Sequence, residues 1–213
     1  MKVIFKGIKS YLIISTIAII IGLLTLSLGE KVAIHLYINN LHTPFFDTFF
    51  TYLTYLGDGM FAAITILVIT LLSKKVNRLY VFILGTITLL LTGIFSQFLK
   101  QVIFPGAYRP RKFIGDDLLY LIPDIDVHSM NSFPSGHTTT AFAFFAFLSF
   151  ILFRKSLIMQ IFMGVIAIII GYSRMYLSQH FLEDVVAGAL IGLLAYIIAA
   201  AITNKIVKKN SLS

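Results

Sequence analysis

The chain has 213 residues, of which 58% are hydrophobic, only 12% are charged and none is cysteine. This composition excludes a soluble globular domain, whose surface requires about a quarter of charged residues, and the lack of cysteine excludes disulfides, thiolate catalysis and cysteine-based metal sites. The net charge of +8 lies in basic residues that flank apolar stretches, so we expect membrane lipids rather than nucleic acid as partners.

Six apolar stretches follow one another along the chain, and about 20 apolar residues suffice to cross a bilayer. Backbone polar groups find no water in lipid, so each stretch is expected to be a helix. The first begins with basic residues as a signal peptide does, but no small-residue cleavage site follows Leu28, which indicates a retained helix. The second is short unless its helix begins earlier. The predicted spans are residues 11–28, 60–72, 79–99, 138–153, 157–177 and 182–202.

An even number of spans places both termini on one side of the membrane, and the charges then separate by sign. All nine acidic residues and all five histidines fall on the side opposite the termini. Because basic residues concentrate in cytoplasmic segments, we predict cytoplasmic termini and an active site on the extracytoplasmic face of the cell (inner) membrane. The basic residues assigned to the cytoplasmic side are Lys2, Lys6, Lys9, Lys74, Lys75, Arg78, Arg154, Lys155, Lys205, Lys208 and Lys209.

Two segments on the outer side are not predicted to span the membrane. In residues 30–58, Thr43 and Pro44 have the pattern of a helix cap followed by proline at the first helical position. The aromatic residues after them suit a helix lying in the membrane interface, and a plain surface hairpin fits equally well. Residues 100–133 form a long loop with three prolines, which is typical of a functional loop. The predicted fold is an all-α, polytopic bundle of six transmembrane helices, a single domain over residues 1–213, with an outer interfacial helix and an active-site loop.

Three chemically active clusters lie on this outer side, and the first two are residues 100–110 and 132–137. Lys100 and Arg109 can each neutralise phosphate charge or anchor the chain at the interface. Pro134-Ser135-Gly136-His137 opens the fourth span, with the proline expected in the first helical turn. The free N–H groups of a helix start attract anions, and His137 is placed to act as a general acid. A simple helix cap with an incidental histidine is the alternative.

The third cluster, residues 173–184, contains Arg174, His180 and Asp184. His180 and Asp184 are four residues apart and would share one face of a helix. A carboxylate bonded to one ring nitrogen leaves the other as a free lone pair, which a histidine nucleophile requires. Arg174 can hold two phosphate oxygens in a planar fork. In the alternative interpretation, Arg174 anchors the chain at the membrane interface and His180 and Asp184 form a surface pair. Occurring together, the three clusters favour phosphoryl transfer, which needs positioning and charge stabilisation.

These motifs resemble the type 2 phosphatidic acid phosphatase family, which is related to bacterial acid phosphatases and vanadium haloperoxidases. The chain has the family's Pro-Ser-Gly-His at residues 134–137, and Ser173-Arg174 followed by His180 and Asp184 at the family's spacing. The resemblance covers about residues 55–203 and includes the six-helix plan. It implies His180 as nucleophile, His137 as general acid and Asp184 as the partner of His180, without a metal or other cofactor. The phosphate-binding residues that it implies are Lys100, Arg109, Ser135, Gly136 and Arg174.

One departure concerns the first motif. The family usually places six residues between the lysine and Arg-Pro, whereas eight separate Lys100 from Arg109 here. A tighter turn at Pro105-Gly106 could restore the geometry. Arg111 could substitute for Arg109, but it lacks the match to Arg-Pro.

Three other functions are alternatives to a lipid phosphatase. A zinc site of His137, His180 and Asp184 is disfavoured, because the surrounding cations would repel a metal ion. A channel or transporter would carry ionisable residues within its spans, and none lies in their interiors. A lipid phosphotransferase using the same histidine remains open. The expected substrate is a lipid phosphate or pyrophosphate, first undecaprenyl pyrophosphate, with lipid A phosphate or phosphatidylglycerol phosphate as the alternatives. The sequence predicts no oligomeric state.

Overall fold

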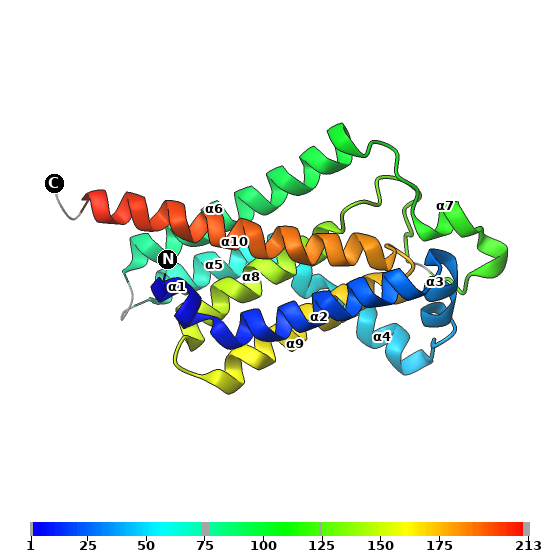
Figure 1. The fold of residues 1–213 in the computed structure, drawn as a ribbon, viewed down its shortest axis with the longest axis horizontal. Coiled ribbons are helices and arrows are strands. Elements are labelled where there is room, and N and C mark those ends of the chain that lie inside the picture. Colours follow the sequence, from blue (N-terminus) through cyan, green and yellow to red (C-terminus); the bar gives the residue numbers. More distant parts are fainter. Residues whose placement is uncertain (1, 74–76, 124, 211–213) are drawn as a thin grey trace.

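The two chain ends lie at the same end of an elongated helical bundle, and α3 and α7 lie at the opposite end (Figure 1). The computed structural model describes residues 2–73, 77–123 and 125–210, so Lys74, Lys75 and Asp124 of the charge assignment lie outside the described residues. The elements in chain order are α1 (Lys2–Gly7), α2 (Lys9–Leu28), α3 (Lys31–Asn39), α4 (Pro44–Leu53), η1 (Thr54–Gly57), α5 (Gly59–Leu72), α6 (Arg78–Phe98), η2 (Leu99–Ile103), α7 (Pro110–Ile114), η3 (Asp116–Leu118), α8 (Gly136–Phe153), α9 (Leu157–Tyr176) and α10 (Leu182–Asn210).

Among the described residues, five helices are long and apolar enough to cross a membrane, namely α2, α6 with its extension η2, α8, α9 and α10. The segments Pro44–Gly57 and Gly59–Leu72 pass the same test together but meet at an angle of 57°, and they make a sixth span if the bent pair crosses the membrane as one unit. The bend falls at Asp58, whose carboxylate accepts hydrogen bonds from the N–H groups of Met60 and Phe61 and so caps α5. The all-helical prediction is confirmed with five to six candidate spans, and the second predicted span lies in α5, the apolar part of the bent pair.

The predicted helix after Thr43 is confirmed as α4. Thr43 Oγ1 accepts a hydrogen bond from the N–H of Phe46 at 3.3 Å, and Pro44 occupies the first turn. α4 presents several exposed aromatic rings, including Phe45 and Tyr52. Such rings suit the boundary between lipid and water, and the position of α4 in a membrane interface stays a prediction.

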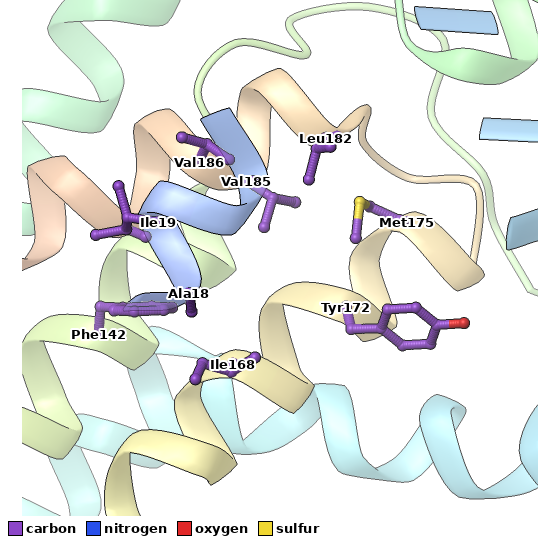
Figure 2. Close-up of a pocket in the computed structure, with 11 residues that line it drawn as sticks. Ala18, Ile19, Phe142, Ile168, Tyr172, Met175, Leu182, Val185 and Val186 are labelled. Carbon is purple, nitrogen blue, oxygen red and sulfur yellow. The ribbon is translucent and has the colours of Figure 1, made fainter. Parts of the chain in front are cut away.

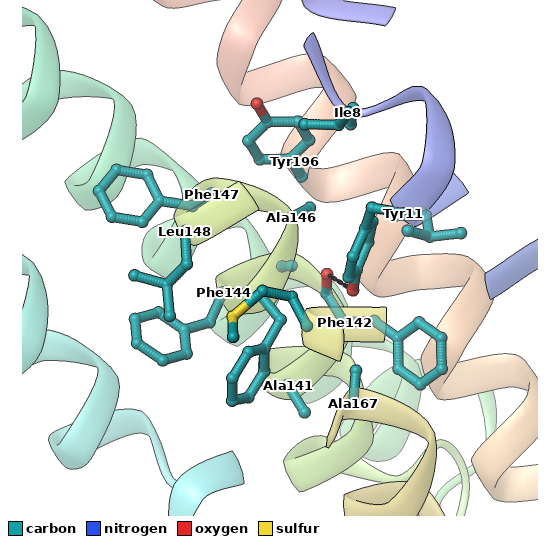
Figure 3. Packing of buried hydrophobic residues seen from close by; sticks show 14 of the residues in the cluster. Ile8, Tyr11, Ala141, Phe142, Phe144, Ala146, Phe147, Leu148, Ala167 and Tyr196 are labelled. Atoms are coloured by element: carbon teal, nitrogen blue, oxygen red, sulfur yellow. Dashed lines mark hydrogen bonds between the residues drawn. The ribbon is translucent and has the colours of Figure 1, made fainter. Parts of the chain in front are cut away.

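α8 is the central helix of the bundle and packs against α6, α9 and α10 (Figure 1). From Ala141 to Phe150 its residues are buried on every side and almost all are apolar, as expected for a helix without a solvent face. Figure 3 shows Phe142, Phe144 and Phe147 of α8 packed among their neighbours, with Tyr11 of α2 donating a hydrogen bond to the carbonyl of Phe142 at 2.6 Å. The core therefore holds α8, and with it the Ser135–His137 segment, in a fixed position.

The start of α10 lies directly against the start of α8. A Cβ on Gly188 would meet the carbonyl oxygen of Ser135 at 2.7 Å, and one on Gly192 would collide with the carbonyl oxygen of Thr139. The N–H of Ser135 donates to the carbonyl of Asp184 at 3.0 Å. Glycine at these positions therefore allows the two helix backbones to touch, which brings the second and third sequence clusters together.

An apolar cavity of about 130 Å³ lies between α2, α8, α9 and α10. Figure 2 shows its walls, formed by side chains such as Ile19, Phe142 and Val186. Tyr172 contributes the only titratable group of the lining. This cavity suits hydrocarbon rather than phosphate and contains none of the predicted site residues.

Candidate active site

A polar cavity of about 540 Å³ lies at the end of α6, the start of α8 and the end of α9. These helix ends lie away from the chain termini (Figure 1). The cavity is formed by the α4–η1 segment, the end of α6, the loop before α8 and the facing ends of α8 and α9. Six of the eight predicted site residues line it: Lys100, Arg109, Gly136, His137, Arg174 and His180. Ser135 and Asp184 lie behind this lining: Ser135 directly precedes Gly136 in the chain, and Asp184 contacts His180.

His180 lies in the turn between α9 and α10, two residues before the first residue of α10. The prediction that His180 and Asp184 share a helix face is therefore wrong for His180, since only Asp184 is helical. The turn is folded back onto α9, because the carbonyl of Arg174 accepts hydrogen bonds from the N–H groups of Gln179 and His180. His180 Nδ1 still lies 3.3 Å from Asp184 Oδ2, so the predicted pair forms.

The ring of His180 is suited to act as a neutral base or nucleophile. Burial, together with the charges of Arg109, Arg174 and Lys100, holds the pKa of His180 well below its ordinary value of 6.5. A neutral imidazole that donates from Nδ1 to Asp184 carries a lone pair on Nε2. His180 Nε2 has no hydrogen-bond partner in the described part of the chain, which leaves this lone pair available on the cavity side.

Ser132 completes the support of the His180–Asp184 pair, and its role was not predicted. Its hydroxyl donates to Asp184 Oδ2 at 2.5 Å and lies 3.5 Å from His180 Nδ1. The N–H of Phe181 donates to the same carboxylate oxygen at 2.9 Å. Two donors besides the imidazole thus fix Asp184 in its buried position. The only signal in the sequence was a serine two residues before Pro134.

The start of α8 presents Gly136 and His137 to the cavity. Ser135 is the N-cap and is fully buried, and its hydroxyl accepts hydrogen bonds from the N–H and the hydroxyl of Thr138. The predicted helix start is confirmed, but Pro134 precedes the cap instead of occupying the first turn. The cap occupies the N–H of Thr138, so the first turn can offer an anion the N–H groups of Gly136 and His137, which have no partner in the described part of the chain.

Two buried arginines reach the cavity without any carboxylate partner in the described part of the chain. Arg109 donates from Nε to the carbonyl of Met130 and from Nη1 to the carbonyl and the side-chain oxygen of Gln179. Arg174 donates from Nη1 to Thr54 Oγ1 at 2.8 Å. Neutral oxygens hold both groups, so their positive charge stays available for an anion of substrate size.

Lys100 and Arg109 line the same cavity despite their longer spacing. Lys100 sits in the π-helical extension η2, and its Nζ donates to the carbonyl of Asn131 at 3.1 Å. Gly106, with φ of +75°, makes the expected turn, and its N–H donates to the side chain of Asn131. Arg111 is instead paired with Asp116 at 2.8 Å on the surface. The extra residues form a surface turn, and Arg109 is the arginine that reaches the cavity.

The outer segment 30–58 also contributes to the site, in a way that the sequence did not indicate. Thr51, Thr54 and Tyr55 line the cavity. His35 and Asn39 of α3 both contact the hydroxyl of Ser178 at 3.2 Å and so support the turn that carries His180. Polar residues scattered along a predicted surface segment give no pattern that would have singled out these contacts.

The described residues contain no group of three histidines, aspartates or glutamates arranged to hold a metal ion. His137, His180 and Asp184 do not form such a group, and three cations border the same cavity. The donor set therefore fits an anion better than a metal, and the absence of a metal requirement stays a prediction.

Comparison with known proteins agrees with this geometry. The PAP2 superfamily profile matches residues 79–208. A lipid A 4'-phosphatase from Bacteroides thetaiotaomicron is 30% identical over 161 residues, which are 74% of this chain and 69% of that protein. A lipid A 1-phosphatase from Rhizobium johnstonii is 33% identical over 56% of this chain, and the match spans only 48% of that protein.

Two crystal structures share the fold. LpxE from Aquifex aeolicus superimposes with a TM-score of 0.66 at 30% identity, covering 79% of this chain and 93% of LpxE. The PAP2-type phosphatidylglycerolphosphate phosphatase from Bacillus subtilis has a TM-score of 0.64 at 26% identity, covering 95% of this chain and 98% of that one. The likeness therefore extends over the whole bundle.

A bundle of membrane-spanning helices with a cationic, histidine-containing cavity at one end, together with these matches, defines an integral membrane lipid phosphatase. The chain belongs to the PAP2 superfamily.

Proposed function

We propose that the chain removes a phosphate group from a lipid A-type glycolipid through a phosphohistidine intermediate on His180. The observation that carries this proposal is the neutral, carboxylate-supported imidazole of His180 in a cavity that it shares with three unneutralised cations. In a phosphate ester placed there, the oxygens would contact Lys100, Arg109 and Arg174, and the phosphorus would face the lone pair of His180 Nε2.

The proposed reaction has two steps. In the first, His180 Nε2 forms a bond to phosphorus, the bond from phosphorus to the lipid oxygen breaks, and His137 gives its proton to that departing oxygen. In the second, water attacks the phosphohistidine, His137 accepts the proton of the water, and inorganic phosphate leaves. Asp184 stabilises the positive charge that develops on His180. The incoming phosphate brings the negative charge that a protonated His137 requires among three cations.

The relatives support the choice of substrate. Lipid A phosphatases are found among the similar sequences, and a phosphatidylglycerolphosphate phosphatase among the similar structures. None of the relatives described above is named for undecaprenyl pyrophosphate, the first expectation from sequence. Lipid A phosphate therefore becomes the first candidate and phosphatidylglycerol phosphate the second.

We also propose that the cavity faces the extracytoplasmic side. Lys6, Lys9, Arg154 and Lys155 lie at the end of the bundle that holds the termini, and the cavity lies at the other end. Such an asymmetry of basic residues is characteristic of a cytoplasmic end. The proposed site would thus act on lipids of the outer leaflet.

The deciding experiment measures phosphate release by the purified full-length protein from a panel of lipids in detergent, with a chelator present. The panel contains lipid A, phosphatidylglycerol phosphate, undecaprenyl pyrophosphate and phosphatidic acid. We expect the highest kcat/KM with lipid A, unchanged by the chelator, and a phosphoenzyme that is labile in acid. His180→Ala should abolish both activity and phosphoenzyme, whereas Asp184→Asn should lower kcat by about a hundredfold or more.

Several outcomes would contradict the proposal. Turnover by His180→Ala would remove the nucleophile, and loss of activity with the chelator would point to a metal. A preference for phosphatidylglycerol phosphate would support the second candidate instead. Transfer of the phosphoryl group to an added alcohol in preference to water would identify a lipid phosphotransferase.

A further inference from the structure

Gln179 connects three parts of the site through its side chain. Its Oε1 accepts a hydrogen bond from Arg109 Nη1 at 3.0 Å, and its Nε2 donates to the carbonyl of Asp126 at 2.8 Å. Gln179 is only 4% exposed and lies directly before His180. The loop before α8, the cation Arg109 and the turn that carries the proposed nucleophile therefore meet at one amide group.

The orientation of this amide is fixed by chemistry. Arg109 can only donate and the Asp126 carbonyl can only accept, so exchanging the oxygen and nitrogen of Gln179 would place like groups against each other on both sides. The contact directs Nη1 of Arg109 toward the turn. Nη2 of Arg109 has no partner within the described residues, and Arg109 lines the cavity.

An amide has a second consequence that a carboxylate would not have. Gln179 holds the guanidinium without neutralising it, and Arg109 has no acidic partner among the described residues. A glutamate here would form an ion pair with Arg109 and would lower its attraction for phosphate. The neutral Gln179 side chain thus leaves the charge of Arg109 for the phosphate of the substrate.

We infer that Gln179 is a positioning residue for phosphate binding: it orients Arg109 toward the cavity and keeps its charge available. This inference rests on the proposed function, since it treats Arg109 as a phosphate ligand. Gln179 itself does not touch the reacting atoms in this arrangement. Its substitution should weaken phosphate binding more than it slows the chemical step.

Gln160 provides a matched control at the other end of the bundle. It is also 4% exposed, and its amide also bonds to main-chain groups, namely the N–H of Ser10 and the carbonyls of Gly7 and Phe153. Loss of either amide removes buried hydrogen bonds and should lower stability to a similar degree. Only Gln179 bonds to a residue that lines the cavity, so only Gln179 should affect phosphate binding.

The experiment compares Gln179→Leu, Gln179→Glu and Gln160→Leu in the full-length protein in detergent. The first readout is the rise of the thermal unfolding midpoint with inorganic phosphate, which reports binding without turnover. The second is KM and kcat for lipid phosphate hydrolysis. Because the carbonyl of Gln179 still accepts from Arg109, we expect Gln179→Leu to weaken phosphate binding and raise KM by about tenfold, with a smaller change in kcat. Gln179→Glu, which is isosteric, should weaken phosphate binding further.

The inference is wrong if Gln179→Leu only lowers the unfolding midpoint, as Gln160→Leu should, while keeping wild-type phosphate binding and KM. Wild-type phosphate binding by Gln179→Glu would refute it equally, and this variant decides the question if Gln179→Leu does not fold. If the wild-type protein binds phosphate and hydrolyses none of the lipids, loss of phosphate binding in the Gln179 variants still supports the positioning role, and the proposed function alone fails.

Discussion

Arg174 donates a hydrogen bond to Thr54 across 2.8 Å and thereby joins the bend between α4 and α5 to the polar cavity. Thr54 is the first residue of η1, between α4 and α5. Arg174 Nε is buried and has no partner in the described part of the chain, so Thr54 is the side chain that orients this guanidinium. The break in the span is thus part of the candidate site as well as of the fold.

Thr54→Val should raise KM for the lipid phosphate by about tenfold, because it removes the acceptor for Arg174 and keeps the shape of the side chain. Thr54→Ser retains the hydroxyl and should keep a KM near that of the wild type. The measurement is steady-state hydrolysis together with the thermal unfolding midpoint. A wild-type KM in folded Thr54→Val would show that Arg174 needs no such support.

Arg109→Gln should move the acid limb of the kcat/KM profile to higher pH. The charge of Arg109 is the largest electrostatic cause, after burial, of the lowered pKa of His180. Removing it makes protonation of His180 easier, and the protonated ring cannot attack phosphorus. The same lipid is used for both proteins, so ionisation of the substrate cancels in the comparison. Lys112→Gln, at an exposed position outside the cavity lining, should leave the limb in place.

His35→Gln should make the protein less sensitive to acid. Burial lowers the pKa of His35 to about 4, and its Nδ1 has no partner in the described part of the chain. Below its unfolded value of 6.5 the unfolded chain binds a proton that the folded protein does not, so stability falls as the pH drops toward 4. At pH 5 the loss is about 2 kcal/mol. Thermal unfolding at pH 7 and pH 5 should show a larger decrease for the wild type than for the variant, and equal decreases would contradict this role of His35.

Cysteine labelling should establish the orientation, since the natural chain has no cysteine that would react. Lys112 on α7 and Lys155 between α8 and α9 are exposed at opposite ends of the bundle. A membrane-impermeant maleimide should modify Lys112→Cys in intact cells and Lys155→Cys only after permeabilisation. The reverse pattern would place the cavity in the cytoplasm.

The spans were predictable because their information is local. A stretch of apolar residues between charges predicts a helix by itself. Thr43 and Ser135 mark helix starts through their own hydrogen bonds, and Pro44 does so as a proline in the first turn. The two-part span was predicted only in its apolar half. Its outer half, α4, carries polar and aromatic residues, so length and hydropathy alone did not reveal that it leads into α5.

Site residues that belong to short sequence motifs could be predicted. Residues that contact the site only because the chain folds could not. Gly136, His137, Arg174 and His180 were assigned to one cavity from motifs, and the structure places them there. The contacts of Thr54, Ser132 and Gln179 join residues far apart in the chain. The chemistry of a single threonine, serine or glutamine does not indicate its partner, so these supporting residues required the structure.

Gly188 and Gly192 imply that the distance between the imidazoles of His137 and His180 depends on two positions that lack a Cβ atom. One imidazole follows the α8 cap, and the other precedes the helix that carries both glycines. Any larger residue at either glycine would act as a spacer and push the two helix starts apart, although it would touch neither histidine. The separation of the two histidines is thus set by the helix contact beneath the site, which requires glycine at both positions.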